Sequence, residues 1–235
     1  MTAEQNRRDF IAIAAGAAVL AGASDALAQQ QQASAPKPQF EIKKLPFDPA
    51  KIKGLSEKLL QSHWENNYSG AVKRLNAIGA QLAGLDFASA PVFVVNGLKR
   101  EELIAANSMI IHELYFDSLN GGGDPSGALA EAITRDFGSL ARWKAEFAAT
   151  GKALGGGSGW VLLTWSPRDK RLVNTWAADH TMTLANGRPV LAMDMYEHAY
   201  AMDYGAAAAK YVDAFMQGIR WETVANRFES YSKQA

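Results

Sequence analysis

The amino-acid sequence predicts an α+β fold, in which an N-terminal antiparallel helical hairpin precedes a C-terminal α/β domain with a small three-stranded antiparallel sheet. Two long segments, 51–83 and 100–119, have the apolar spacing of helices, and the Pro- and β-branched-rich stretch ASAPVFVVNG separates them. Later in the chain the pattern changes, because SGWVLLTW, RLVNTWAA and PVLAMD are rich in β-branched and aromatic residues. These observations favour a pair of helices followed by a sheet.

The expected elements follow one another in a simple order. Residues 40–121 are predicted to form the helical hairpin domain, and residues 122–235 the α/β domain. In the α/β domain, helical stretches at 127–136 and 139–153 precede the strands, and SPRDK supplies the turn between the first two strands. Residues 206–232 are expected to return to helix.

The N-terminal residues 1–28 have the pattern of a twin-arginine export signal. Paired arginines precede a modest Ala- and Gly-rich apolar run, and Ala26 with Ala28 forms the small-x-small site that a signal peptidase cleaves. The alternative is an uncleaved membrane anchor, for which the run is short and rich in Ala and Gly. We therefore expect a periplasmic or secreted protein, with no stable membrane insertion after signal cleavage, and a polar, flexible linker over 29–39.

Composition excludes several classes of function. The formal net charge is 0, with 24 basic and 24 acidic side chains and no long run of Lys or Arg, so we expect no nucleic-acid partner. Cysteine is absent, which excludes thiolate catalysis, iron–sulfur clusters and disulfides. His, Asp and Glu remain as the strong metal ligands, and this ligand set alone does not choose the metal.

Histidines are the most informative residues, since the chain has only 4. His63 and His112 fall in the two long helical segments, and His198 follows Asp194 at a spacing where one helical turn would place both on a common face. Taken singly, each has a simpler explanation, as part of a surface ion pair, as a solvated helix residue or as a hydrogen-bonded core histidine. A metal site built from three imidazoles and one carboxylate therefore depends on the wider pattern of motifs.

Four motifs supply that pattern. DMYEHAY, followed by MDY, resembles the D-x-W-E-H-A-Y-Y signature of the iron/manganese superoxide dismutase family. GGGDPSGALAEAITRDFGSLARWKAEF, GSGW and LPFDPAKIKGLS are similar to other segments of that family, and the resemblance runs in order from Phe40 to Tyr231. It implies an oxidoreductase that converts superoxide to dioxygen and hydrogen peroxide, with one Fe or Mn ion per subunit.

The resemblance also implies roles for particular residues. The metal ligands would be His63, His112, Asp194 and His198. The catalytic residues would be His180, Tyr115 and Trp160: His180 contacts the bound solvent and tunes the potential of the metal, and the other two line the pocket. A surface-turn histidine is the alternative for His180. Glu197 would reach across a homodimer interface to the partner subunit's His198 and orient its free ring nitrogen.

The chain departs from the family pattern around the expected substrate channel. Asn67 stands where the family has a second histidine, Ala71 replaces a gateway tyrosine, and Ala201 replaces the tyrosine that meets that histidine across the dimer. Tyr196 replaces the signature tryptophan. Two functions stay open: a superoxide dismutase using Fe or Mn, or a superoxide-dismutase-like metal-binding protein with weak or no dismutase activity. A hydrolytic zinc enzyme is disfavoured, because no HExxH arrangement is present.

Overall fold

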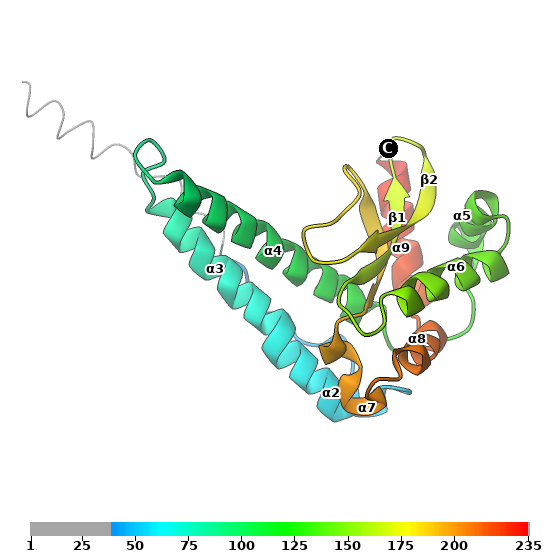
Figure 1. Ribbon diagram of the computed structural model, residues 1–235. Coiled ribbons are helices and arrows are strands. Elements are labelled where there is room, and N and C mark those ends of the chain that lie inside the picture. The colour runs from blue at the N-terminus through cyan, green and yellow to red at the C-terminus, as the bar shows by residue number, and fades with distance from the viewer. Residues whose placement is uncertain (1–38, 235) are drawn as a thin grey trace, which may run out of the picture.

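The computed structural model describes residues 39–234, so the predicted export signal and nearly all of the predicted linker lie outside the described residues. The first half of the described chain forms the predicted antiparallel helical hairpin (Figure 1). Its first arm is a continuous helix of three parts, and its second arm is one long helix. In chain order, the elements are the 3-10 turn η1 (Pro49–Lys51), α2 (Glu57–Ser62), the π-helical η2 (His63–Tyr68), α3 (Ser69–Ala83) and α4 (Val92–Asp117).

The second half forms the predicted α/β part. Two helices precede a sheet of three antiparallel strands in the order β2-β1-β3, which confirms the predicted sheet. Two short helical turns and two helices complete the described chain. In chain order, the elements are α5 (Gly127–Phe137), α6 (Leu140–Ala153), β1 (Trp160–Ser166), β2 (Arg171–Ala177), β3 (Arg188–Asp194), η3 (Glu197–Ala199), α7 (Ala201–Tyr204), α8 (Ala208–Gln217) and α9 (Trp221–Lys233).

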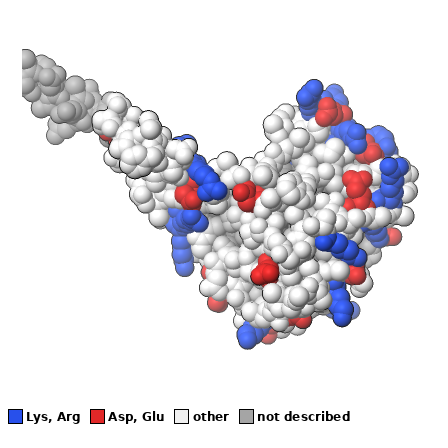
Figure 2. All heavy atoms as spheres, in the orientation of Figure 1, with Lys and Arg blue, Asp and Glu red and all other residues white. Residues whose placement is uncertain are grey.

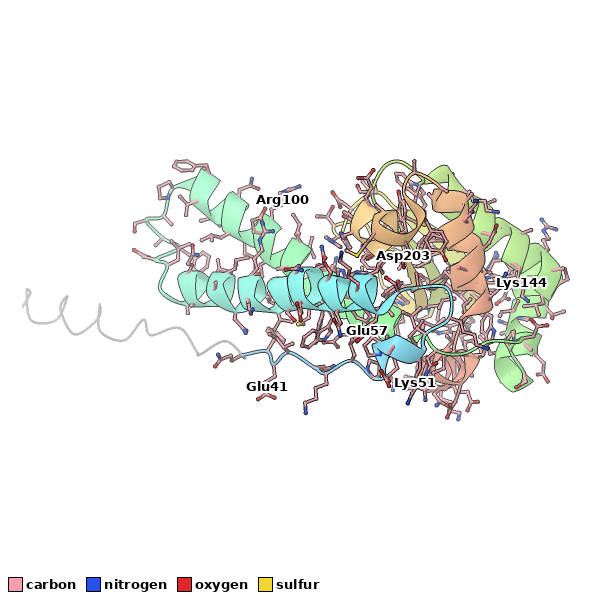
Figure 3. All side chains as sticks on the ribbon, turned by 90° about the horizontal axis from the view of Figure 1, so that it is seen from below. Glu41, Lys51, Glu57, Arg100, Lys144 and Asp203 are labelled. Carbon is pink, nitrogen blue, oxygen red and sulfur yellow. The ribbon has the colours of Figure 1, made fainter. Side chains whose placement is uncertain are left out.

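The first arm begins at Glu57, and not at residue 51 as predicted. Ser56 has extended backbone angles, and its hydroxyl accepts the backbone N–H of Leu59, which is the geometry of a helix N-cap. Asp203, which Figure 3 shows beside the start of this arm, accepts both the backbone N–H and the hydroxyl of Ser56 at 2.6 Å. These hydrogen bonds hold Ser56 extended, so the helix starts directly after it.

The second arm begins earlier than predicted, because part of the stretch ASAPVFVVNG is helical. Pro91 comes directly before the helix, and its carbonyl accepts the backbone N–H groups of Val94 and Val95. Proline is tolerated at a helix start, where its missing N–H has no partner to lose. The β-branched residues there suggested a non-helical connection, but Val92 is 84% exposed and packs against nothing that would require a strand.

The predicted helix over 206–232 is broken between α8 and α9, because the chain there pairs with the segment after α4. The backbone N–H of Arg220 donates to the Ser118 carbonyl at 2.7 Å, and that of Gly121 donates to the Gly218 carbonyl at 3.0 Å. A Cβ atom at Gly121 would lie 2.4 Å from Arg220 Cα, so this close approach requires glycine. The break ties the hairpin to the C-terminal helices.

The hydrophobic core lies where the end of the hairpin meets the sheet. β1 is buried along its whole length; α6 and α9 pack against it, and α4 packs against β3. Large aromatic side chains fill this region, including the fully buried Trp143, Trp160, Tyr115 and Tyr211. The packing of α4 on β3 brings η2, α4 and the last residue of the sheet together.

The surface carries charges of both signs. On the face shown in Figure 2, Lys and Arg side chains lie beside Asp and Glu side chains over the C-terminal half of the chain. Ion pairs between charged side chains of the protein include Lys144 with Asp124 and Arg227 with Asp117. Within residues 39–234, no helix is long and apolar enough to cross a membrane. The division into domains between residues 121 and 122 stays a prediction.

Candidate metal centre

Four side chains from four separate elements converge where the hairpin meets the sheet. His63 lies in η2, His112 in α4, Asp194 at the end of β3 and His198 in η3. One donor atom from each residue lies within 4.8 Å of the donor atoms of the other three. His63, His112 and Asp194 are buried, and His198 is partly exposed. The structure therefore brings together the four residues expected to bind a metal, and we call them the metal cluster.

Asp194 and His198 do not share a helical turn, as their spacing suggested. Asp194 is the last residue of β3, Tyr196 has extended backbone angles, and His198 lies in the 3-10 turn η3. The backbone N–H of Tyr196 donates to Asp194 Oδ1 at 2.8 Å, which turns the chain back after the strand. The two side chains meet through this turn, with 3.2 Å between His198 Nε2 and Asp194 Oδ2.

The three Nε2 atoms of the metal cluster surround one carboxylate oxygen. Asp194 Oδ2 lies 3.1 Å from His63 Nε2, 3.6 Å from His112 Nε2 and 3.2 Å from His198 Nε2. Ligand atoms on metal bonds of about 2.1 Å lie about 3.0 Å apart at a right angle and about 3.6 Å apart at 120°. The distances therefore match donor atoms that share one metal ion.

The nitrogen atoms inside the cluster have lone pairs to offer. His112 Nδ1 lies 2.6 Å from the backbone carbonyl oxygen of Ser108, so Nδ1 carries the proton and Nε2 keeps its lone pair. Among the described residues, His112 Nε2 and both ring nitrogens of His63 are buried without a hydrogen-bond partner. Buried polar atoms are rarely left unpaired. A neutral His63 ring keeps a lone pair on one of its two nitrogens, so His63 and His112 each offer one ligand atom beside the carboxylate, as in an imidazole and carboxylate metal site.

The same surroundings set the protonation states that a metal requires. Burial lowers the pKa of His63, and it lowers the pKa of His112 to about 3, so both imidazoles are neutral at pH 7. Burial acts to raise the pKa of Asp194, but the charge and the hydrogen bond of His198 hold that pKa below its ordinary value. Metal ions bind neutral imidazole and ionised carboxylate, and both are present here.

A π-helical stretch, which no pattern in the sequence predicted, positions His63. The backbone N–H of Ser69, at the end of η2, bonds to the carbonyl of Trp64, five residues earlier in the chain. π-helical turns are rare in proteins, and many of those that occur lie at functional sites. The apolar spacing of the first arm predicts a helix but does not distinguish α from π, because only the backbone hydrogen bonds differ.

His180 lies beside the metal cluster with one ring nitrogen already occupied. It sits in the connection between β2 and β3, and its Nδ1 lies 2.9 Å from the indole Nε1 of Trp160. An indole N–H can only donate, so His180 Nδ1 accepts, and the proton of the neutral ring is on Nε2. Burial lowers the pKa of His180, which keeps the ring neutral at pH 7. Its centroid is 6.1 Å from that of His112.

Tyr196 lies between two of these imidazoles. Its ring centroid is 4.9 Å from that of His180 and 5.3 Å from that of His198, with interplanar angles of 13° and 18°. Burial raises the pKa of Tyr196 to about 12, and a hydrogen bond from the backbone N–H of His180 acts against that rise. Tyr196 therefore holds both the ring and the backbone of His180. The sequence identified it only as a replacement for a tryptophan, because stacking of this kind depends on the tertiary fold.

Other residues expected at the site lie on different sides of the cluster. Tyr115 is fully buried, with its ring centroid 5.1 Å from that of His63. Phe116, next in the chain, has its centroid 5.0 Å from His63. These two buried rings pack against His63 and shield that ring from water. Glu197 is exposed at the surface, directly before His198.

A pocket of about 340 Å³ reaches the metal cluster from the hairpin. Its wall includes His112, His180 and His198 together with Asn67, Gly70, Ala71, Arg74 and Ser108. Helical spacing from His63 leads to Asn67 and Ala71, four and eight residues later in the chain. The sequence did not point to Gly70 and Arg74, although the same helical spacing continued along α3 leads to both. We call this cavity the cluster pocket.

Comparison with known proteins identifies the family. Residues 125–227 match the family model for the C-terminal domain of iron/manganese superoxide dismutases. An iron superoxide dismutase of Cupriavidus metallidurans is 71% identical over 189 residues, which cover 80% of this chain and 96% of that protein. The chain belongs to the iron/manganese superoxide dismutase family.

More distant members of the iron/manganese superoxide dismutases are named for either metal. A manganese superoxide dismutase of Haloarcula marismortui is 33% identical over 199 residues, covering 80% of this chain and 93% of that protein. An iron superoxide dismutase of Aquifex pyrophilus is 35% identical over 193 residues, covering 79% and 89%. The predicted family and its α+β fold are confirmed, while the roles of single residues stay predictions.

Proposed function

We propose that this chain is a superoxide dismutase whose one Fe or Mn ion is held by the metal cluster, His63, His112, Asp194 and His198. The observation that carries the proposal is the convergence of three Nε2 atoms on one ionised carboxylate oxygen, at 3.1 to 3.6 Å. Imidazole and carboxylate donors suit both Fe and Mn. Membership of the family supports the reaction, and relatives named for each metal support either ion.

Dismutation converts two superoxide anions and two protons to dioxygen and hydrogen peroxide. A bound Fe or Mn ion supplies a one-electron couple, which takes an electron from one superoxide and gives it to the next. The protein then has three tasks: to hold the ion, to keep the centre apart from bulk water and to handle protons. The buried rings of Tyr115 and Trp160 serve the second task, since both are fully buried against cluster histidines.

His180 is the residue that we assign to the solvent at the centre. Because Trp160 occupies Nδ1, the Nε2–H of His180 is the group free to donate a hydrogen bond into the cluster pocket. Hydrogen bonds to solvent at a metal change its proton affinity and the reduction potential of the ion. Trp160 acts through His180, so it is a positioning residue, and Tyr196 supports the same ring from its other side.

A metal-binding protein with weak or no dismutase activity is the second candidate. Asn67 and Ala71 favour it, because they line the cluster pocket and neither side chain can donate a proton. A wall without an acidic group would slow the formation of hydrogen peroxide, which needs two protons.

Superoxide decay per bound metal ion separates the two candidates. Stopped-flow traces of Fe-loaded and Mn-loaded protein are compared, with the metal content of each sample measured by elemental analysis. Fast decay with one of the metals is the expected result. Full occupancy with negligible decay would favour the second candidate, and the absence of both bound Fe and bound Mn after loading would overturn the ligand assignment.

We also propose a homodimer in which Glu197 orients the partner subunit's His198. Within the described residues, His198 Nε2 faces Asp194, whereas no hydrogen bond is found to His198 Nδ1, and Glu197 is exposed beside it. Metal-binding histidines commonly donate their second N–H to a carboxylate. Sedimentation equilibrium of metal-loaded protein is expected to give a dimer that Glu197→Gln weakens, with about 10-fold lower metal affinity. A monomeric loaded protein would contradict this proposal.

We propose, further, that residues 1–28 direct export by the twin-arginine route. The paired Arg7 and Arg8 and the small-x-small site after them support this, and the route carries folded proteins, so a metal can be inserted first. In a Gram-negative host, the full chain is expected in the periplasmic fraction, and the Arg7→Lys, Arg8→Lys double variant in the cytoplasm. Equal export of both forms would contradict the proposal.

A further inference from the structure

A cavity of about 390 Å³ lies on another part of the molecule, between the segment that leads into α2, the segment that follows α4 and the end of α8. None of the residues that line it belongs to the metal cluster or to the wall of the cluster pocket. Pockets that bind small molecules usually have volumes of about 300–1,000 Å³, so this cavity is large enough for a ligand. We call it the lysine pocket, after Lys51 and Lys53 in its wall.

The inner wall of the lysine pocket is apolar. Leu55, Leu119 and Phe215 line the pocket, and all three are buried. The Phe215 ring stacks on Tyr115, with 5.9 Å between the ring centroids and an interplanar angle of 10°. Side chains packed into a core in this way keep their positions, so the pocket offers a preformed apolar surface to a ligand.

The charged side chains of the lysine pocket are all positive. Lys51, which Figure 3 shows at the η1 turn, and Lys53 line the pocket, and its wall contains no Asp or Glu. Lys51 Nζ lies 3.3 Å from Asp48 Oδ2, in an exposed ion pair of the kind that contributes little to stability. For Lys53 no ion pair is found among residues 39–234. An anion would therefore meet one ammonium group without a partner and a second one held only by a surface pair.

The side-chain amides of Asn120 and Gln217 add hydrogen-bond donors. Both residues line the lysine pocket, and neither amide has a hydrogen-bond partner among the described residues. Asn120 has a φ of +70°, which is uncommon for residues other than glycine. Backbone conformations of this kind are found more often at sites with a function. An amide N–H donates to a carboxylate oxygen, so these two groups suit the same anion as the lysines.

We propose that the lysine pocket binds a small carboxylate whose apolar body is about the size of a benzene ring. The carboxylate lies between the ammonium groups of Lys51 and Lys53 and accepts hydrogen bonds from the amides of Asn120 and Gln217, while the ring packs against the buried inner wall. The site goes beyond the proposed dismutation, since it includes no residue of the metal cluster.

Calorimetric titration of metal-loaded protein with benzoate tests this site. Saturable binding is expected, with a dissociation constant of about 1 mM. Benzamide has the ring without the charge, and acetate has the charge without the ring, so each is expected to bind at least about tenfold more weakly. Binding of benzamide or of acetate as tight as that of benzoate would overturn the proposal.

Substitution of the two lysines locates the site. Lys53→Gln is expected to weaken benzoate binding about fivefold, and the Lys51→Gln, Lys53→Gln double variant to abolish it, because loss of Lys51 also leaves Asp48 unpaired. Lys58→Gln is the matched control, since it removes the same charge from an exposed lysine that does not line the pocket, and its affinity should equal that of the wild type. An equal loss in Lys53→Gln and Lys58→Gln would mean that benzoate responds to net charge alone, and would overturn the proposal.

Asn120→Gly tests the amide without a change of charge. Glycine accepts the φ of +70° and removes the donor, so benzoate is expected to bind about threefold more weakly. Asn186→Gly is the control, because Asn186 has a φ of +58° and does not line the lysine pocket. Should the double lysine variant fail to fold, this pair replaces it, and equal affinities in the pair would overturn the proposal.

Binding at the lysine pocket is distinguished from binding at the metal centre by competition. Carboxylates also bind metal ions, and azide is a small anion that binds metal ions but has no apolar body. Saturating azide is expected to leave the benzoate affinity of the metal-loaded protein unchanged. Displacement of benzoate by azide, or benzoate binding that the double lysine variant retains in full, would place the ligand elsewhere and overturn the proposal.

Discussion

The indole Nε1 of Trp160 donates a 2.9 Å hydrogen bond to Nδ1 of His180, and this bond decides which nitrogen of His180 carries the proton. Trp160 is the first residue of β1, whereas His180 lies in the connection that follows β2. The hydrogen bond from the strand therefore keeps the proton of His180 on Nε2, and this N–H is the hydrogen-bond donor beside the metal cluster.

Loss of this bond should lower activity without removing the metal. In Trp160→Phe, His180 can exchange its proton between both nitrogens, so superoxide decay per bound metal is expected to fall about 10-fold, with unchanged metal content. Trp165→Phe is the matched control, because Trp165 lies on the same strand and its buried Nε1 has no hydrogen-bond partner among the described residues. Equal decay rates in the two variants would contradict the role of Trp160.

The hydroxyl of Tyr196 should matter more than its ring. Tyr196→Phe keeps the stacking between His180 and His198 but removes the oxygen that the His180 backbone N–H reaches. We expect a few-fold lower decay rate and a shifted pH profile at unchanged metal content. Tyr204→Phe is the control, since the Tyr204 hydroxyl bonds to the Gly54 carbonyl at the surface. An unchanged pH profile in Tyr196→Phe would rule out this positioning role.

Gly159, directly before Trp160, should be intolerant of any side chain. Its φ of +140° is unfavourable for other residues, and a Cβ atom would lie 2.2 Å from the Ala177 carbonyl oxygen of the neighbouring strand. Gly159→Ala is expected to lower the free energy of unfolding by about 1–3 kcal/mol, measured by urea denaturation. Gly157→Ala should change little, because its Cβ would meet only the Leu154 carbonyl oxygen at 3.5 Å. Equal free energies of unfolding for Gly159→Ala and Gly157→Ala would contradict the predicted backbone strain at residue 159.

The metal-free protein should lose stability as the pH falls from about 6.5. The ordinary histidine pKa is 6.5, whereas burial lowers that of His63 and lowers that of His112 to about 3 in the folded state. Below pH 6.5 the unfolded chain therefore binds more protons than the folded chain, so the free energy of unfolding falls as the pH falls. For His112 the loss is about 1.4 kcal/mol per pH unit between about pH 6.5 and about pH 3, and the lowered pKa of His63 adds to it.

Urea denaturation of the metal-free protein between pH 7 and pH 4 measures this slope. His112→Asn removes one of the two buried imidazoles, so its slope should be smaller than that of the wild type by about one proton. A wild-type stability that does not change over this interval would show that the cluster histidines are not held neutral.

The sequence predicted the parts of the site that depend on short-range patterns. His63 and His112 fell in segments with clear helical spacing, and the motif around Asp194 and His198 placed those two residues close together. Local geometry was harder to predict, because a turn after β3 and a helical turn give the same spacing along the chain. The position of the residues was therefore better predicted than their conformation.

Tertiary contacts account for what the sequence did not reveal. The π-helical η2 and the stacking of Tyr196 depend on hydrogen bonds and packing between segments distant in the chain. The break before α9 likewise results from pairing of Gly218 and Arg220 with the segment after α4, which no pattern within 206–232 indicates. The β-branched residues around Val92 indicated a connection between the two helices, but they form the exposed first turn of α4.

Metal content of the wild type, His198→Ala and His180→Ala tests the central claim most directly. Elemental analysis of protein loaded with Fe or Mn should give about one ion per chain for the wild type and for His180→Ala, because His180 lies beside the cluster and is not one of its four donors. His198→Ala should lose the ion and the superoxide decay together. Full Fe or Mn occupancy in His198→Ala would contradict the account.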